Sequence, residues 1–336
     1  MTTPGGRLVR RNGSLAVFLK EQLLAEIPLY KTHVVVLHAG TQVTTPALLL
    51  LLRTGGKVVM LSRSGKVIGA AWPSTEPKLE QIKAQIALEN RPQFRLELAK
   101  TIVEGKIKSQ CAYLQLRARW ASKQRLSPEI FRERKNQIEK LLPRIAEATT
   151  LSALRGLEGL ASRLYFAALG DYWRSKGLKF QGRRAHPPRD LANAALSYGY
   201  GVLQSYVVVA MHAAGLLPSP GILHEDELHY APMVYDLMEE FRVAAVDMVV
   251  SKLLANRTLN PKLTERKSGA VYLNELARKR LVQALSAQLE KNFYNPTTNA
   301  TAPLREHLFT QAAKLAQSIR EERPYSAFHL TVKEEQ

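Results

Sequence analysis

Cysteine is almost missing from this sequence of 336 residues, and long apolar runs are missing as well. Cys111 is the only cysteine, which excludes an internal disulfide and a cysteine-based zinc site. The longest uninterrupted apolar run, residues 47–52, is far short of the ~20 residues that span a bilayer. The opening MTTPGGRLVRRNGS has arginines without an apolar segment behind them, unlike a secretory signal. We therefore expect a cytoplasmic protein that no membrane holds.

Acidic residues are also scarce. The sequence has 29 Asp and Glu against 48 Lys and Arg, which gives a formal net charge of +19 and a pI near 10.0. A charge excess of this size favours a polyanionic partner, with nucleic acid ahead of a membrane surface. A soluble basic protein without such a partner is the remaining alternative.

The first 75 residues have the pattern of strands separated by turns. Leu15, Val17 and Leu19 alternate with other residues, and THVVVL at 32–37 is rich in β-branched side chains. Between the strands, TTPALLLLLRTG is typical of a short helix with Pro46 at its first position. No catalytic cluster is visible in this stretch. We expect residues 1–80 to form a small β-rich domain that mediates dimerisation or positions the rest of the chain.

Beyond residue 77 glycine and proline become scarce, and charged residues fall between apolar ones at helical spacing. Apolar residues make up 46% of the sequence, enough for two hydrophobic cores in a chain of this length. We therefore predict an α+β protein, in which the small β-rich N-terminal domain is followed by a larger all-α domain at residues 85–336.

The segment at 221–243, GILHEDELHYAPMVYDLMEEFRV, holds the densest set of metal-capable side chains. Its second half has the apolar spacing of an amphipathic helix that starts near Ala231. Asp236 and Glu239 lie three residues apart, which stacks both carboxylates on one face, close enough to share a cation. His224 falls in the preceding loop, which can fold back over them. A solvated acidic face and a surface histidine are the ordinary alternatives.

Glu158 is the anomaly of an otherwise apolar helix, LSALRGLEGLASRLYFAALG, because it lies beside the core stripe. A buried carboxylate costs several kcal/mol unless it is paired or coordinated, so this Glu requires a metal or a cationic side chain. From this helix alone a salt-bridged structural Glu is favoured. Tyr165 lies two turns further on the same face, where a core tyrosine is favoured over a nucleophile.

The segment WRSKGLKFQGRRAHPPRD is the most basic of the chain, and its glycines and prolines predict a loop. Lys and Arg in a flexible loop are suited to phosphate contact, since they displace condensed counterions from a nucleic-acid backbone. This loop follows the helix of Glu158 and precedes the helix that leads to His224. Sequential segments can therefore bring a Glu, a basic loop, a His and an acidic pair to one place.

Three stretches resemble the Cas1 family of CRISPR-associated adaptation integrases: GLEGLASRLYFAAL, RRAHPPRDLANAALSYGYGVL and GLLPSPGILHEDELHYAPMVYDLMEEFRVAAVD. IPLYKTHVVVLHAGTQVTTPALLLLLRTGGKVVMLSRSGKVIG is similar to the β-rich N-terminal domain of that family, and LAKTIVEGKIKSQ to its first long helix. The resemblance covers nearly the whole chain. One departure is Ser109, where the family often has Asn.

The resemblance implies a divalent-metal site at Glu158, His224 and Glu239, with Asp236 in the accompanying acidic position. It implies Mg²⁺ or Mn²⁺ as the ion. The residues that match the family's motif between the first two ligands, and that we expect near DNA, are Arg183, Arg184, Arg189, Asn193 and Tyr200.

The activity implied by the resemblance is metal-dependent DNA integration, which joins 3′-hydroxyl ends of short DNA segments to a repeat by transesterification, with DNA endonuclease activity. The implied partners are DNA, a second copy of the chain in a homodimer, and a small second CRISPR adaptation subunit. Two rival functions are a catalytically silent DNA-binding scaffold and a transposon-borne integrase of the same family.

Overall fold

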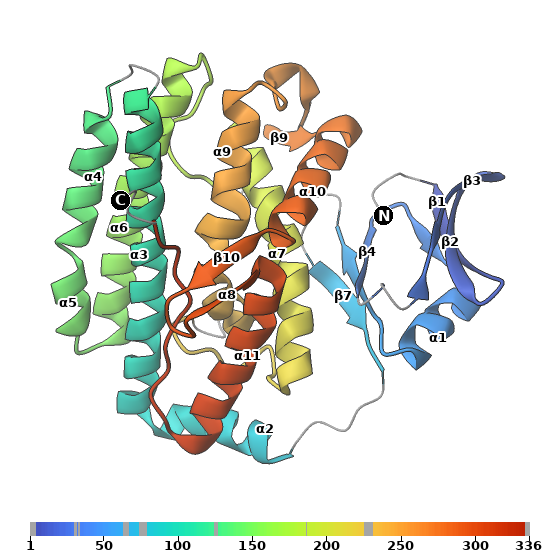
Figure 1. Ribbon diagram of the computed structural model, residues 1–336, viewed down its shortest axis with the longest axis horizontal. Helices are drawn as coiled ribbons and strands as arrows, with labels where there is room; N and C mark the ends of the chain where they lie inside the picture. Colours follow the sequence, from blue (N-terminus) through green and yellow to red (C-terminus); the bar gives the residue numbers. More distant parts are fainter. Residues whose placement is uncertain are drawn as a thin grey trace.

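The computed structural model describes residues 5–29, 32, 34–62, 67–73, 79–123, 127–185, 187–224 and 231–332. A β-rich region comes first and a mostly helical region follows, as predicted (Figure 1). Strand β7, Val67–Ala71, is the last strand of the first region, and α2, Leu79–Ile86, is the first helix of the second. The predicted α+β class is confirmed, and the division at residues 80 and 85 stays a prediction.

The described strands of the β-rich region form two sheets. Their strand orders are β3-β2-β1-β5 and β4-β6-β7. Strands β4 and β6 pair in parallel because α1, Thr45–Arg53, carries the chain between them, and Pro46 lies in the first turn of that helix. The remaining strands are β1 Gly6–Arg11, β2 Ser14–Leu19, β3 Gln22–Ile27, β4 Val34–His38, β5 Gln42–Val43 and β6 Lys57–Leu61.

Strand β6 faces both hydrophobic cores of the molecule. Val58 belongs to the small N-terminal core and Val59 to the large helical core, because successive strand residues point to opposite faces. On the helical side, the ring of Trp72 stacks on that of His212 with the centroids 4.1 Å apart. The β4-β6-β7 sheet therefore packs directly against the helical region, beside α7 (Figure 1).

Helix α7, Leu191–Ala214, lies at the centre of the helical region. It begins where the Asp190 side chain accepts the Asn193 N–H, and it ends at Gly215 with φ of 76°, a left-handed conformation that favours glycine. By length and composition α7 could cross a membrane, but 83% of its apolar window is buried inside the protein. Its apolar character is that of a core helix.

Around α7 lie long and short helices. The long ones are α3 Pro92–Lys123, α4 Glu129–Glu139, α6 Leu151–Ser175, α10 Glu275–Leu289 and α11 Leu304–Glu321. The short ones are α5 Leu142–Ala146, α8 Pro232–Glu239 and α9 Met248–Ala255, with single turns at Ala87–Asn90 and Pro261–Leu263 and a π-helical turn, η3, at Arg242–Asp247.

The helical region also contains strands, which the prediction of an all-α domain did not include. It contains two hairpins, which pair β8 Thr264–Lys267 with β9 Ala270–Leu273 and β10 Asn292–Asn295 with β11 Ala300–Pro303. Both hairpins form between helices. Residues with a left-handed backbone conformation allow the chain to reverse, Ser268 and Gly269 in the first hairpin and Asn299 in the second. These four-residue strands are too short to show a clear alternating pattern, so the sequence did not reveal them.

Residues 323–332, the C-terminal strap, pack across α3 and the end of α8. The Glu240 carboxylate accepts hydrogen bonds from the Tyr325 hydroxyl at 2.5 Å and from the Phe328 N–H at 2.6 Å. On α3, Ser109 Oγ accepts the Leu330 N–H at 3.0 Å. The strap therefore braces two helices that are distant in the sequence, and Ser109 has a structural role.

Candidate active site

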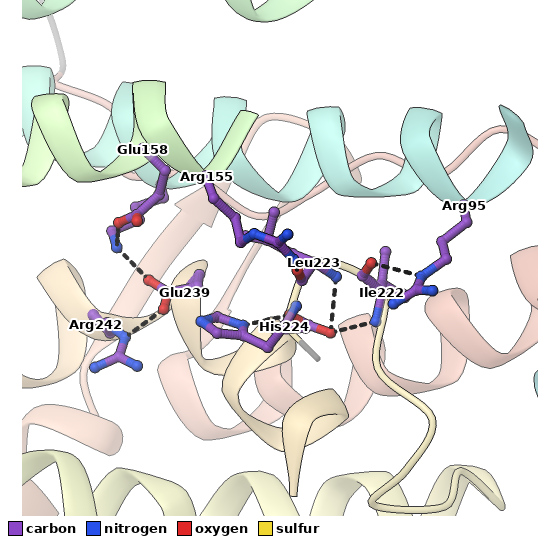
Figure 2. A network of polar contacts seen from close by, with 10 residues as sticks. Arg95, Arg155, Glu158, Ile222, Leu223, His224, Glu239 and Arg242 are labelled. Carbon is purple, nitrogen blue, oxygen red and sulfur yellow. Dashed lines mark hydrogen bonds and ion pairs between the residues drawn. The ribbon is translucent and has the colours of Figure 1, made fainter. Parts of the chain in front are cut away.

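The predicted ligands come from three segments of the helical region. Glu158 lies on α6, His224 ends the described part of the loop before α8, and Glu239 ends α8. Figure 2 shows that Glu158 and Glu239 approach the same point and that His224 lies beside Glu239. Lys106 of α3 occupies that point, because its Nζ contacts Glu158 Oε1 and lies 2.5 Å from Glu239 Oε2.

Glu239 is 3% exposed, and it faces the interior rather than solvent. The expected alternative of a solvated acidic face is therefore wrong for this helix. Burial raises the pKa of Glu239, but the charges of Arg242, Lys106 and His224 outweigh burial and bring the pKa down to about 2. Arg242 Nε lies 3.0 Å from Glu239 Oε1. The carboxylate is therefore ionised at neutral pH and fixed from two sides.

Asp236 holds the loop that carries His224. Its carboxylate accepts backbone N–H groups from Ile222 at 2.5 Å, Leu223 at 3.2 Å and His224 at 3.0 Å, and the His224 ring nitrogen Nδ1 lies 2.6 Å from Oδ1. Both oxygens are thus occupied and the side chain is fully buried. The structure places Asp236 behind the histidine, so we assign it a positioning role in place of the predicted metal contact.

The carbonyl side of the same loop is held by two arginines. Arg95 Nε of α3 donates to the Ile222 carbonyl at 2.9 Å, and Arg155 Nη1 of α6 donates to the Leu223 carbonyl at 3.1 Å. Figure 2 shows both arginines reaching the loop from neighbouring helices. Because both edges of its backbone are bonded, the loop presents His224 in one position.

The His224 ring is held in one orientation and one tautomer. Asp236 is already an acceptor for backbone N–H groups, so Nδ1 carries the proton and Nε2 is the nitrogen suited to a metal. Burial lowers the pKa of His224, but the hydrogen bond and charge of Asp236, together with Glu239, outweigh burial and raise it. Metal binding at Nε2 would therefore compete with protonation.

Glu158, His224 and Glu239 carry side chains that can bind a divalent cation, although the structure does not bring all three together. Among the described residues, no three His, Cys, Asp or Glu side chains converge closely enough to hold a metal. The two carboxylates do reach a common point, because one ammonium contacts both. Glu239 Oε2 is buried and accepts no hydrogen bond of normal geometry despite that ion pair. A buried carboxylate oxygen that faces a single cation fits a divalent metal ion in place of that cation.

The basic loop between α6 and α7 has an inner part, around Arg183, and an outer part, around Arg184 and Arg189. Arg183 Nη1 donates to Asn193 Oδ1 at 3.0 Å, and the guanidinium lies over the Tyr200 ring, 5.4 Å from the centroid. Arg184 and Arg189 are exposed to solvent. The structure therefore leaves two of the three predicted loop arginines on the surface and turns the third toward the site.

Asn193 and Tyr200, which we expected near DNA, are buried on α7. All four hydrogen-bonding positions of the Asn193 amide are used, by Arg183, the Arg184 N–H, the Gly182 carbonyl and Asp190. The Tyr200 hydroxyl donates to Asp247 at 2.6 Å. We reassign Asn193 to holding the basic loop, since an amide that is already saturated cannot bind DNA without releasing it. Tyr165 is fully buried, as expected of a core tyrosine.

A cavity of about 670 Å³ opens beside the carboxylates. Its charged lining joins the candidate site to the inner part of the basic loop, through Lys106, Arg163, Arg174, Arg183, Glu239, Arg242 and Asp247. Burial raises the pKa of Asp247 to about 6 against the opposing effects of Tyr200, Tyr165 and Arg242. Five of these seven side chains are cationic, so the cavity suits an anionic group.

Comparison with known proteins decides the family. The sequence model described as CRISPR associated protein Cas1 matches residues 1–287. This chain belongs to the Cas1 family. The CRISPR-associated endonuclease Cas1 1 of Thermus thermophilus is 36% identical over 98% of both chains. A Cas1 endonuclease of Methanopyrus kandleri is 32% identical over 73% of this chain and 72% of that protein. The family predicted from the sequence is confirmed.

Solved structures with the same fold include a Cas1 protein and a casposase. A Cas1 protein from Thermotoga maritima superposes with a TM-score of 0.72 at 20% identity, over 98% of this chain and 97% of that chain. A casposase bound to integration product gives a TM-score of 0.79 at 20% identity, over 97% and 91%. A Cas6-RT-Cas1–Cas2 complex gives 0.77 at 25% identity, over 100% of this chain and 36% of the other.

Proposed function

We propose that this Cas1-family chain is a metal-dependent DNA integrase of CRISPR adaptation, acting in the cytoplasm. It would join 3′-hydroxyl ends of short DNA segments to a repeat, and it would cleave DNA when water replaces the hydroxyl. The observation that carries the proposal is the meeting of Glu158 and Glu239 at a single cation beside a fixed His224. Relatives named endonucleases, and a casposase of similar fold bound to an integration product, support this class of reaction.

In the joining reaction the 3′ oxygen of the incoming DNA loses its proton and bonds to a phosphorus of the repeat. The bond from that phosphorus to the repeat's own 3′ oxygen breaks, and this oxygen takes up a proton and leaves as a new 3′-hydroxyl. The chemistry that a bound Mg²⁺ or Mn²⁺ would supply is activation of the attacking oxygen and neutralisation of charge on the phosphoryl group. Glu158, Glu239 and Nε2 of His224 would hold it. A histidine among carboxylates suits Mn²⁺ somewhat better than Mg²⁺. Asp236 keeps the imidazole from turning, and Arg183 and Arg242 line the neighbouring cavity, where they would place positive charge beside a reacting phosphate.

A strand-joining assay tests the proposal. The protein is incubated with a 3′-hydroxyl duplex and a repeat-containing plasmid, with Mg²⁺, Mn²⁺ or EDTA, in the presence and absence of the small second subunit. We expect a joined product on a denaturing gel that depends on the metal and increases at the repeat with the partner. DNA binding without joining or cleavage would indicate a scaffold, and joining that ignores both repeat and partner would favour a transposon-borne integrase.

The two exposed loop arginines are expected to carry part of the DNA affinity. Replacing Arg184 and Arg189 with Ala should weaken binding, and each lost phosphate contact should lower the slope of log affinity against log salt by roughly 0.9. A salt titration by fluorescence anisotropy measures this slope for the wild type and for the double variant. Replacement of Lys20, an exposed residue of the β-rich region, serves as the control. An unchanged slope in the double variant would show that these arginines do not contact DNA.

We further propose that the chain forms a homodimer through its β-rich region. Strand β3 is the outer strand of its sheet, and Leu23 and Leu24 on it are 39% and 47% exposed. An apolar edge strand is a ready pairing surface, and a symmetric dimer would cover it. A dimer would also present two active sites to the two ends of a repeat.

The dimer surface can be tested without truncating the chain. The wild type should scatter light as twice the 37.6 kDa of one chain, and the double variant Leu23→Lys, Leu24→Lys should scatter as a monomer. Leu276→Lys is the matched control, since Leu276 of α10 is similarly exposed at 45% but belongs to the helical region. A monomeric wild type, or a variant that stays dimeric, would contradict the assignment.

A further inference from the structure

Lys106 is the cation that holds the candidate site together, and nothing in the expected ligand set accounts for it. Its side chain is 10% exposed, and the ammonium lies between carboxylates from α6 and α8. Lysine is rarely buried to this degree unless it is paired. Here the pairing is double, which places Nζ where a metal shared by Glu158 and Glu239 would have to bind.

Charge counting shows why both cations cannot stay. Lys106 and Arg242 already balance the charges of Glu158 and Glu239. A divalent ion added to this neutral group would leave an excess of two positive charges among these side chains. The neighbouring Asp247 carboxylate offsets only part of that excess, and like charges repel strongly in a poorly solvated place. An ammonium and a metal ion would also contact the same oxygen, Glu239 Oε2. Binding of the metal therefore requires the ammonium to move.

The neighbouring cavity offers a place for it. Gln110 lies one turn further along α3, and both Lys106 and Gln110 line the cavity of about 670 Å³. The Gln110 side chain is 1% exposed, and within the described part of the chain its Oε1 atom accepts no hydrogen bond. A buried carbonyl oxygen without a donor is costly, so this one is a ready acceptor for a lysine ammonium.

We propose that Lys106 is a displaceable counter-ion of the metal site. Its ammonium keeps Glu158 and Glu239 together before the metal arrives, and it withdraws toward Gln110 Oε1 when a divalent cation binds. This inference rests on the proposed metal dependence, and it adds that metal affinity is set partly by a lysine that is not a ligand. Without metal, the Lys106 ammonium offsets the repulsion between the two carboxylates. The same ammonium lowers the affinity of the site for a metal ion, because it has to be displaced first.

The test measures binding of Mn²⁺ alone to the full-length protein by isothermal titration calorimetry, without DNA, together with thermal melting. Lys106→Met should bind Mn²⁺ at least about tenfold more tightly than wild type, because no cation has to be displaced. Its metal-free melting temperature should fall, and Mn²⁺ should raise it by more than in wild type. Lys108→Met is the matched control, since Lys108 pairs with Glu104 on the exposed face of α3. That variant should bind Mn²⁺ like the wild type.

A double-mutant cycle tests the receiving position. Gln110→Met should weaken Mn²⁺ binding several-fold when Lys106 is present and leave it unchanged in the Lys106→Met background, because only a displaced lysine needs the acceptor. Equal effects in both backgrounds would show that Gln110 does not receive the ammonium.

Lys106→Met that binds Mn²⁺ no more tightly than wild type overturns the proposal. If that variant does not fold, Lys106→Arg decides instead, since a guanidinium that grips both carboxylates should weaken Mn²⁺ binding at least about tenfold. Unchanged Mn²⁺ affinity in Lys106→Arg would also overturn the proposal. Mn²⁺ binding by the wild type and by Glu239→Gln distinguishes failure of the metal site from failure of the role proposed for Lys106. Absence of Mn²⁺ binding in the wild type refutes the proposed metal dependence itself. Wild-type binding that Glu239→Gln abolishes and Lys106→Met leaves unaltered refutes only the role of Lys106.

Discussion

Glu239→Gln is expected to abolish strand joining, with a loss of at least about a thousandfold, which exceeds the roughly 10- to 100-fold that residues behind a metal ligand typically cost. The substitution keeps the size of the side chain but removes the charge that Lys106 and Arg242 face. Without the Glu239 carboxylate, the metal would lose one of its two acidic ligands. Glu158→Gln and His224→Ala should have effects of the same order.

Gel quantification of joined product over a titration of Mg²⁺ and Mn²⁺ measures the loss. Glu104→Gln is the matched control, because Glu104 is an exposed partner of Lys108 on α3 and lies outside the candidate site. Circular dichroism and melting should show that Glu239→Gln is folded. Joining at wild-type rate by this variant at any metal concentration would mean that the site has been placed wrongly.

Asp236→Asn is expected to be nearly as damaging, and for a different reason. The carboxylate accepts three backbone N–H groups and faces His224 Nδ1, and an amide can offer only one of its two ends as an acceptor. Leaving buried N–H groups without a partner costs about 1–3 kcal/mol each, so we expect the free energy of unfolding to fall by about 3 kcal/mol.

Hydrogen exchange distinguishes the two kinds of damage. In Asp236→Asn the amides of Ile222, Leu223 and His224 should exchange faster, whereas Glu239→Gln should leave them as protected as in wild type, because it does not touch that loop. Denaturant unfolding provides the stability change. If Asp236→Asn showed wild-type protection at these amides and wild-type stability, Asp236 would not be the residue that holds the loop.

The sequence predicted the fold class and the family correctly because both depend on patterns that run along the chain. Alternation over short strands, helical spacing after residue 77 and the stretches around Glu158 and His224 are all local features. The prediction also named the two carboxylates that the structure brings to one point. The small hairpins escaped it, since four-residue strands carry too little periodicity to be recognised.

Lys106 and Arg242 were missed because their roles depend on contacts between helices. Lys106 follows Leu98 and Ile102 at four-residue spacing, so it falls on the buried stripe of α3, and a lysine there is a signal that can be read in advance. The sequence did not show which carboxylate it would meet, because Glu239 is far away along the chain. Asn193 misled us for a related reason: a polar residue in a family motif can serve the protein's own loop rather than the substrate.

The C-terminal strap has a consequence for when the site becomes complete during synthesis. Leu330 bonds to Ser109 across 221 residues of sequence, and Phe328 bonds to Glu240, the neighbour of Glu239. A ribosome-bound chain that stops short of residue 325 lacks the brace between α3 and α8, and contacts of such long separation form late because loop closure opposes them. We therefore expect the helices that carry Lys106 and Glu239 to reach their final packing only after nearly every residue described has been made, so that the candidate site stays unfinished in a nascent chain until the strap is present.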